Sequence, residues 1–238
     1  MTDIQTAAAQ VAEGVAIVAD AEAAGAQARL IGGAAIAWHS GRADTPHRTF
    51  SDLDMVVSRK GAGALTKALE QRGYEGERQF NALNADTRLI FHGPTGKLDV
   101  FVERFQMCHE IPLRSRLELD TPTVTVTDLL LTKLQVVQIN EKDVQDVALL
   151  LDTHECRAGE GDWVNGDYLG GLLGDDWGLW RTVTESLGAV ARAEPRIGPR
   201  AEEILAAIEA GPKTRRFRLR AKIGERKRWY ELPEEVDE

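Results

Sequence analysis

Residues 51–57, Ser-Asp-Leu-Asp-Met-Val-Val, decide the fold of this chain. Acidic and apolar residues alternate from position 52 to 55, which is the period of a β-strand. Asp52 and Asp54 therefore share one face, with Cα atoms roughly 6.6 Å apart at a rise of about 3.3 Å per residue. Carboxylates so placed can hold divalent cations, because hard ions prefer oxygen ligands. An acidic solvent-facing strand is an equally ordinary explanation, so this motif alone defines no site.

The sequence around this strand alternates between strand-prone and helical patterns, which predicts an α/β (α+β) fold with a mixed β-sheet flanked by helices. A hairpin is expected where two strand-prone runs flank the turn at 93–96. The other expected strands lie at 29–31, 88–92 and 97–102, and the expected helices lie at 3–26, 34–39 and 62–71.

A third acid, Asp99, stands opposite the apolar side chains of its own strand. If this strand pairs beside 51–57, at the usual spacing of roughly 4.8 Å, Asp99 comes within reach of the same metals. Three carboxylates repel one another unless a cation neutralises them, so we expect a metal site of Asp52, Asp54 and Asp99.

Gly32 and Gly33 lie between an expected strand and an expected helix. Backbone N–H groups at such a turn can approach an anion, although a tight turn uses glycine for steric reasons too. Arg48 precedes the acidic strand and is a candidate for binding a phosphate tail, because a guanidinium binds phosphate bidentately. Most loop arginines are simply solvated. Ser51 either touches phosphate or begins the strand.

The second half of the chain is expected to be helical. Thr125-x-x-Asp128 resembles a capping box, and Asn140 can cap a second helix. Further helical patterns run over 175–193 and 199–210. We expect a domain at 1–120, a helical domain at 121–210, and a basic tail at 211–238 that ends in an acidic segment.

The tail concentrates positive charge in residues 213–228. Residues 216–220 alternate basic and apolar side chains at strand period, and Trp229 and Tyr230 could stack on bases, so the segment could track an RNA backbone. The alternative is a C-terminal strand or arm that neutralises acidic surface.

Composition limits the classes of partner. A net charge of −9 means that any nucleic-acid binding must come from a local basic patch. No apolar segment approaches the ~20 residues that span a bilayer, so no membrane partner is expected. Two cysteines, Cys108 and Cys156, fit a reducing compartment, and neither lies at zinc-site spacing to a histidine. We therefore expect a cytoplasmic protein.

Three motifs in order, at 30–33, 51–56 and 97–101, resemble the polymerase-β-like nucleotidyltransferase superfamily. The pattern of that superfamily is a Gly-Gly or Gly-Ser turn, an Asp-x-Asp strand and a later single acid. The resemblance implies an NTP such as ATP as substrate, Mg²⁺ or Mn²⁺ as cofactor, and two-metal phosphoryl transfer. It implies that Asp52 and Asp54 ligate both ions, and that Asp99 binds one ion and helps deprotonate the acceptor hydroxyl.

Lys133, followed by Lys142-Asp143-x-x-Asp146, resembles the helical segment of the abortive-infection toxin-like branch of that superfamily. By this resemblance Lys133 contacts phosphate and Asp143 or Asp146 helps to shape the site, with a possible antitoxin as partner. An arginine is commoner in that branch where Lys142 stands here. The alternative is a solvated helix face on which Lys142 and Asp146 pair at i, i+4.

Three functions remain open from the sequence. The first is an active nucleotidyltransferase whose acceptor is a tRNA end, a protein side chain or a small hydroxylated molecule. The second is a catalytically silent nucleotide- or RNA-binding module of the same fold. The third is an RNA-binding protein in which the acidic strand is incidental. Retention of all three acids favours the first, because a module that only binds nucleotide needs no carboxylate to activate a hydroxyl.

Overall fold

The computed structural model describes residues 3–232, and it divides into two compact units. The first unit holds the chain up to residue 105 together with 111–129, and the second holds 106–110 together with the chain from 130 onward. The acidic segment that the sequence places at the C-terminal end falls within 233–238, outside the described residues.

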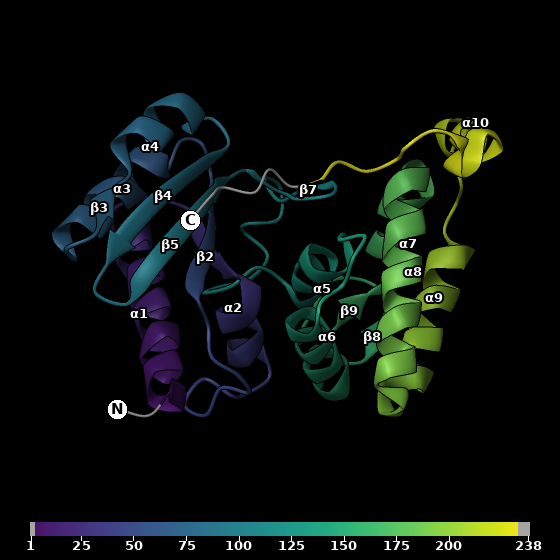
Figure 1. Cartoon of the computed structure of the whole chain (residues 1–238), viewed down its shortest axis with the longest axis horizontal. Helices are drawn as coiled ribbons and strands as arrows, with labels where there is room; N and C mark the ends of the chain where they lie inside the picture. Colours follow the sequence, from purple (N-terminus) through teal and green to yellow (C-terminus); the bar gives the residue numbers. More distant parts are fainter. Residues whose placement is uncertain (1–2, 233–238) are drawn as a thin grey trace. The chain divides into compact units, whose positions relative to one another are not determined.

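The first unit is built on a five-stranded sheet (Figure 1). In sheet order the strands are β1 (Ala28–Ile31), β2 (Asp52–Val57), β5 (Gly96–Val102), β4 (Arg88–Gly93) and β3 (Glu75–Gly76). β2 and β5 run parallel, and the other three pairs are antiparallel. This mixed sheet confirms the predicted fold class, including the hairpin of β4 and β5.

Helices cover this sheet because their apolar residues recur at helical spacing. α1 packs beside α2, α3 and β1 (Figure 1), and its buried residues include Val11 and Val18. The helices of the first unit are α1 (Asp3–Ala23), α2 (Gly32–His39), α3 (Ala62–Gln71) and α4 (Arg78–Asn84). α4 was not predicted, because it buries no residue and so has no apolar period. A two-stranded sheet of β6 (Arg104–Gln106) and β7 (Glu110–Pro112) follows.

The second unit is mainly helical, and side-chain caps begin its helices. Asn140 accepts from the backbone N–H of Asp143, as predicted, and Asn165, Asp176 and Thr214 cap three later helices in the same way. Its helices are α6 (Glu141–Thr153), α7 (Gly166–Asp175), α8 (Trp177–Ala193), α9 (Gly198–Ala210) and α10 (Arg215–Ile223), with 3₁₀ turns η1 (Pro195–Ile197) and η2 (Gly224–Arg226). α5 (Val126–Leu134) spans the junction between the units.

Two sequence-based expectations for this half are wrong. The second half is not all-helical, because β8 (Cys156–Arg157) pairs in parallel with β9 (Val164–Asn165). Residues 216–220 form part of helix α10 rather than a strand or arm. The alternation of basic and apolar residues misled because Phe217 is buried whereas Leu219 is 52% exposed, so no apolar strand face exists. Arginine, leucine and lysine are good helix formers.

Within residues 3–232, no helix is long and apolar enough to cross a bilayer.

Candidate functional site

The parallel pairing of β2 with β5 places Asp54 and Asp99 side by side, as direct register partners. Asp52 lies two residues earlier on β2, opposite Lys97, and its side chain accepts from the Ser51 hydroxyl at 3.1 Å. Asp52 and Asp54 are half-buried, whereas the apolar residues between and after them are buried. The strand pairing on which the three-carboxylate site depends is therefore present.

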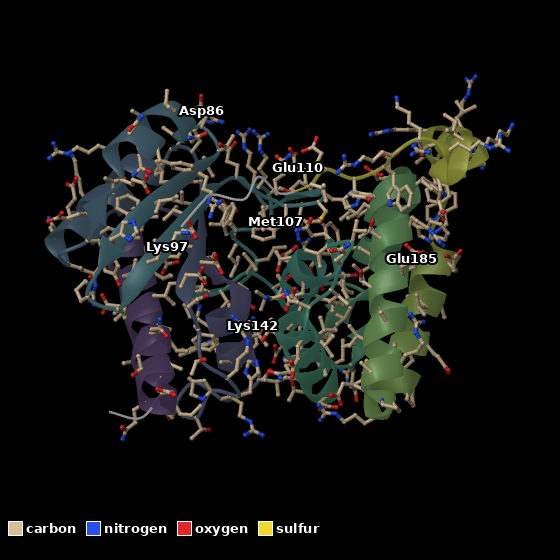
Figure 2. All side chains as sticks on the ribbon, viewed as in Figure 1. Asp86, Lys97, Met107, Glu110, Lys142 and Glu185 are labelled. Carbon is tan, nitrogen blue, oxygen red and sulfur yellow. The ribbon has the colours of Figure 1, made fainter. Side chains whose placement is uncertain are left out.

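Asp99 is 2% exposed, and two cations of the sheet neutralise it. Arg88, on the adjacent strand β4, reaches Asp99 Oδ1 with Nη2 at 2.9 Å and with Nε at 3.2 Å. Lys97 Nζ lies 3.4 Å from Asp99 Oδ2 (Figure 2 labels Lys97 on β5). The Arg88 guanidinium also stacks on the Phe101 ring, 5.3 Å from its centroid. Asp99 is thus a buried carboxylate with two ion pairs.

These ion pairs neutralise Asp99 within the sheet itself. Asp99 is directed to Arg88 and Lys97. The donor set still fits a hard divalent cation in chemistry, because all three groups are carboxylates on neighbouring strands of one sheet.

The Gly32–Gly33 turn lies against the side chains of Asp54 and Arg48. Gly32 has φ +71°, a conformation that favours glycine, and a Cβ atom added there would come within 3.0 Å of Asp54 Oδ2. The Asp54 carboxylate therefore rests against the backbone of Gly32. A Cβ atom at Gly33 would meet the guanidinium of Arg48 just as closely.

Arg48 is placed at this turn by the loop before β2. Its guanidinium lies over the Phe50 ring, 5.1 Å from the centroid, and Nη1 donates to the Thr49 carbonyl at 2.8 Å. α2 begins at Gly32, and its N-cap residue Ile31 provides no side-chain hydrogen bond. The first N–H groups of α2 and a guanidinium thus form a basic corner beside the acidic strand, and such a corner suits an anion.

Lys133, Asp143 and Asp146 come together within the second unit. Lys133 Nζ lies 2.9 Å from a carboxylate oxygen of each aspartate, and Asp146 is fully buried. Burial lowers the pKa of Lys133, but the charges of Asp146 and Asp143 outweigh it, so the pKa is raised overall. Lys133 is therefore a cation held between two carboxylates.

Sequence reasoning missed Arg88, although a signal for it exists. The two-residue hairpin turn pairs Gly93 with Gly96, and counting back along both strands sets Arg88 opposite Phe101. Side chains diagonal to such a pair lie within reach of long residues, which brings Arg88 to Asp99. Register counting from the turn would have found this contact.

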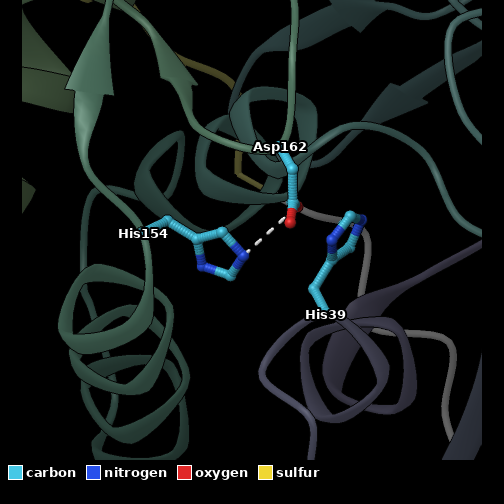
Figure 3. A group of neighbouring side chains, drawn as sticks. All are labelled: His39, His154 and Asp162. Carbon is cyan, nitrogen blue, oxygen red and sulfur yellow. Dashed lines mark ion pairs between the residues drawn. The ribbon is translucent and has the colours of Figure 1, made fainter.

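Two histidines, His39 and His154, have ordinary partners inside their own units. In the first, His39 Nε2 lies 2.7 Å from the Thr123 hydroxyl and 3.1 Å from the Val124 carbonyl. In the second, His154 follows α6 and forms an ion pair with Asp162 at 3.5 Å (Figure 3). Cys108 and Cys156 are free thiols.

No family model and no curated protein matches the chain. Among solved structures, it is similar to the crystal structure of an antigenic nucleotidyltransferase-like protein from Paracoccidioides brasiliensis. The similarity covers 86% of this chain and 94% of that one, with 15% sequence identity and a TM-score of 0.45. Most aligned positions hold different residues in the two chains, so the function has to be derived from the residues of this one.

Proposed function

We propose that the chain is a metal-dependent nucleotidyltransferase that transfers a nucleoside monophosphate from an NTP to an acceptor hydroxyl. One observation carries the proposal: the Asp54 carboxylate rests on Gly32 while the Arg48 guanidinium rests on Gly33. A metal-bound triphosphate needs a carboxylate for the metal and a cation for the phosphates. Here the carboxylate and the cation lie against two adjacent glycines.

In this proposal one group of residues binds the phosphates and another binds the metal. Gly32, Gly33 and Arg48 bind the phosphates through the N–H groups of α2 and the guanidinium, and Ser51 orients Asp52. Asp52, Asp54 and Asp99 would hold Mg²⁺ or Mn²⁺. When bound, the metal would neutralise charge on the triphosphate and make the acceptor hydroxyl easier to deprotonate.

The reaction balances as a displacement at phosphorus. The acceptor oxygen forms a bond to the α-phosphorus, the bond from that phosphorus to the α,β-bridging oxygen breaks, and pyrophosphate leaves. The hydroxyl proton passes to Asp99 or to water. The acceptor stays within the classes that the sequence left open, namely an RNA end, a protein side chain or a small hydroxylated molecule.

For the second unit taken by itself, we carry over to Lys133 the phosphate contact that the resemblance to the toxin-like branch implies. An ammonium carries three N–H donors, and the two carboxylates of Asp143 and Asp146 engage two of them. The two aspartates would orient the third donor. A toxin role with an antitoxin partner belongs to the same proposal.

The test is transfer of label from each of the four α-³²P-NTPs, with Mg²⁺ or Mn²⁺, to total cell RNA and to lysate protein. Asp54→Asn and Asp99→Asn should each lower transfer at least about 100-fold. Loss of a residue that only hydrogen-bonds a metal ligand already costs about 10- to 100-fold, and these two residues would be ligands themselves. Asp86→Asn is the matched control, since it removes one carboxylate from an exposed position in the same unit. Equal labelling by wild type and Asp54→Asn would refute the proposal.

One observation favours a second candidate, a catalytically silent nucleotide-binding module. Arg88 and Lys97 already neutralise Asp99, so the acidic group is stable without metal. This candidate predicts that the wild type binds NTP in calorimetry, with binding lost in Arg48→Met, while no acceptor is labelled. Label transfer by the wild type would exclude it.

A further inference from the structure

We propose that the second unit carries a binding surface for single-stranded RNA, formed by α10 and the residues that follow it to Tyr230. This inference does not rest on the proposed transfer reaction, because it concerns a different unit and requires neither NTP nor metal.

The first observation is charge. The chain as a whole has a net charge of −9, yet residues 213–228 hold only one acid, Glu225. Their basic side chains are Lys213, Arg215, Arg216, Arg218, Arg220, Lys222, Arg226, Lys227 and Arg228. A local excess of cations on an acidic protein marks a place where a polyanion can bind.

The second observation is how α10 presents these cations. Arg215, Arg218 and Lys222 are spaced i, i+3 and i+7, so they lie on one face of the helix, and all three are exposed. Within residues 3–232, none of the three forms an ion pair with a carboxylate. Cations that pair with none of the described acids are placed to meet an external partner.

The opposite side of α10 fixes the helix to its unit. Phe217 is buried and meets Trp180 edge to face, with ring centroids 5.5 Å apart. The Arg220 guanidinium stacks on Trp177 at 4.6 Å and donates to the carbonyls of Gly224 and Lys227, both at 2.6 Å. The basic face is therefore held on a packed helix, and it needs little reorganisation to bind.

The third observation is a pair of hollows that share Ile223, at the end of α10. The first has a volume of about 390 Å³ and combines Trp180 with Lys222 and Arg226, and Glu225 also lines it. The second has a volume of about 630 Å³ and is lined by Trp229 and Tyr230 together with Arg220, Lys227 and Arg228. Two acids, Glu110 and Glu231, lie at its wall as well. Each hollow sets an aromatic ring beside cations.

Aromatic rings beside a track of cations are the features with which proteins bind single-stranded nucleic acid, since bases stack on the rings and phosphates pair with the cations. RNA is the commoner partner of this kind, because its loops and ends expose unstacked bases. A membrane-binding helix needs a continuous apolar face, whereas the large apolar side chains that α10 exposes are Leu219 and Ile223, with cations on both sides of them. Single-stranded RNA is therefore the occupant that the surface fits.

The test uses the full chain, without NTP and with EDTA, and a fluorescein-labelled 20-nucleotide poly-U RNA. Anisotropy titrations at several KCl concentrations give the affinity and its salt slope. Arg218→Gln/Lys222→Gln/Arg226→Gln removes three phosphate contacts, each of which contributes about 0.7 to a single-strand slope. The slope should fall by about 2, and the affinity at 0.1 M salt should fall on the order of 100-fold.

Two further variants make the test specific. Lys60→Gln/Lys67→Gln/Arg78→Gln removes the same charge from exposed positions of the first unit, and it should leave both quantities near the wild-type values. Tyr230→Leu should weaken binding about 5- to 150-fold without changing the salt slope, because a stacked base contributes about 1–3 kcal/mol. This variant also keeps the test decisive should the triple variant fold poorly.

The outcomes separate the alternatives. Equal losses in the two triple variants would show binding by overall charge and overturn the proposal, as would a wild type that binds no RNA. Binding to phosphatidylserine vesicles with no binding to RNA would assign the surface to membranes instead and also overturn it. Asp54→Asn should bind RNA as the wild type does, so a failure of the proposed transfer reaction leaves this result intact.

Discussion

Gly32→Ala is the most direct perturbation of the proposed site, and the structure separates its two costs. The first is conformational, because alanine at φ +71° costs about 1–2 kcal/mol. The second is steric, because the new methyl group would come within 3.0 Å of Asp54 Oδ2. Forcing the carboxylate off its rotamer adds about 0.5–1.5 kcal/mol. The free energy of unfolding should therefore fall by about 1.5–3.5 kcal/mol.

Gly25→Ala is the matched control. Gly25 lies in the same unit with φ +82°, but a Cβ atom added there meets nothing within 4 Å. It should lose only the conformational part, about 1–2 kcal/mol. Urea unfolding followed by circular dichroism measures both variants.

Transfer activity should separate the two variants further. A displacement of about 1 Å in a positioned group costs on the order of 10²-fold in rate, so Gly32→Ala should lose that factor in label transfer while Gly25→Ala keeps wild-type activity. If the two variants lose equal stability and equal activity, the Asp54 carboxylate does not depend on Gly32, and the reasoning that joins the turn to the acidic strand is refuted.

Two further predictions concern stability. Arg116→Met should lower the free energy of unfolding, measured in urea, by about 3–5 kcal/mol, because the fully buried Asp128, 2.5 Å from Arg116 Nε, loses its charge partner. Adding Asp128→Leu should recover part of this loss. An Arg116→Met variant as stable as the wild type would contradict the prediction. Burial lowers the pKa of His109, against smaller opposing effects of Asp176 and Glu231, so the folded chain binds this proton less readily than the unfolded chain does. Stability should therefore fall as pH drops below the ordinary histidine value of 6.5. His109→Asn should flatten the dependence between about pH 7 and pH 5, and an unchanged slope would show that other groups cause it.

The parts of the fold that the sequence predicts are those with strong local patterns. α3 has the predicted bounds, and β4 and β5 follow from two apolar runs around a short turn. The pairing of β2 with β5 is different, because nothing local specifies which strands become neighbours. It was predicted only as a condition for Asp99 to reach Asp54, and the register meets that condition.

The parts that local patterns miss are those that packing decides. α7 contains several glycines, which weaken a helix, but Asn165 caps it and Gly170 lies directly against Gly211 at the end of α9. A side chain at Gly170 would meet backbone atoms, so the glycine that lowers helix propensity is what permits the contact. Such a gain is visible only in three dimensions.

The candidate site shows the same division between local pattern and packing. The identities and order of Gly32, Asp54 and Asp99 are legible in the sequence, but the neutralisation of Asp99 by Arg88 is not, because it depends on a third strand. The expectation that a metal neutralises these acids therefore stays a prediction, although Asp99 already has two ion pairs. Two cations were already present in the sheet.

The way in which Asp99 is held limits how the proposed site can work. Both contacts of Arg88, through Nη2 and Nε, go to Oδ1, and together they use the two lone pairs of that oxygen. Lys97 lies 3.4 Å from Oδ2, too long for a strong hydrogen bond. Oδ2 is therefore the oxygen that can exchange partners. Arg88 would then serve as a positioning residue that fixes the carboxylate on the face it shares with Asp54, and Lys97 as the cation that a metal displaces. In the silent module Lys97 would stay beside Asp99 Oδ2. The metal-dependent enzyme and the silent module are therefore distinguished by comparing the concentration of Mn²⁺ at half saturation between the wild type and Lys97→Gln.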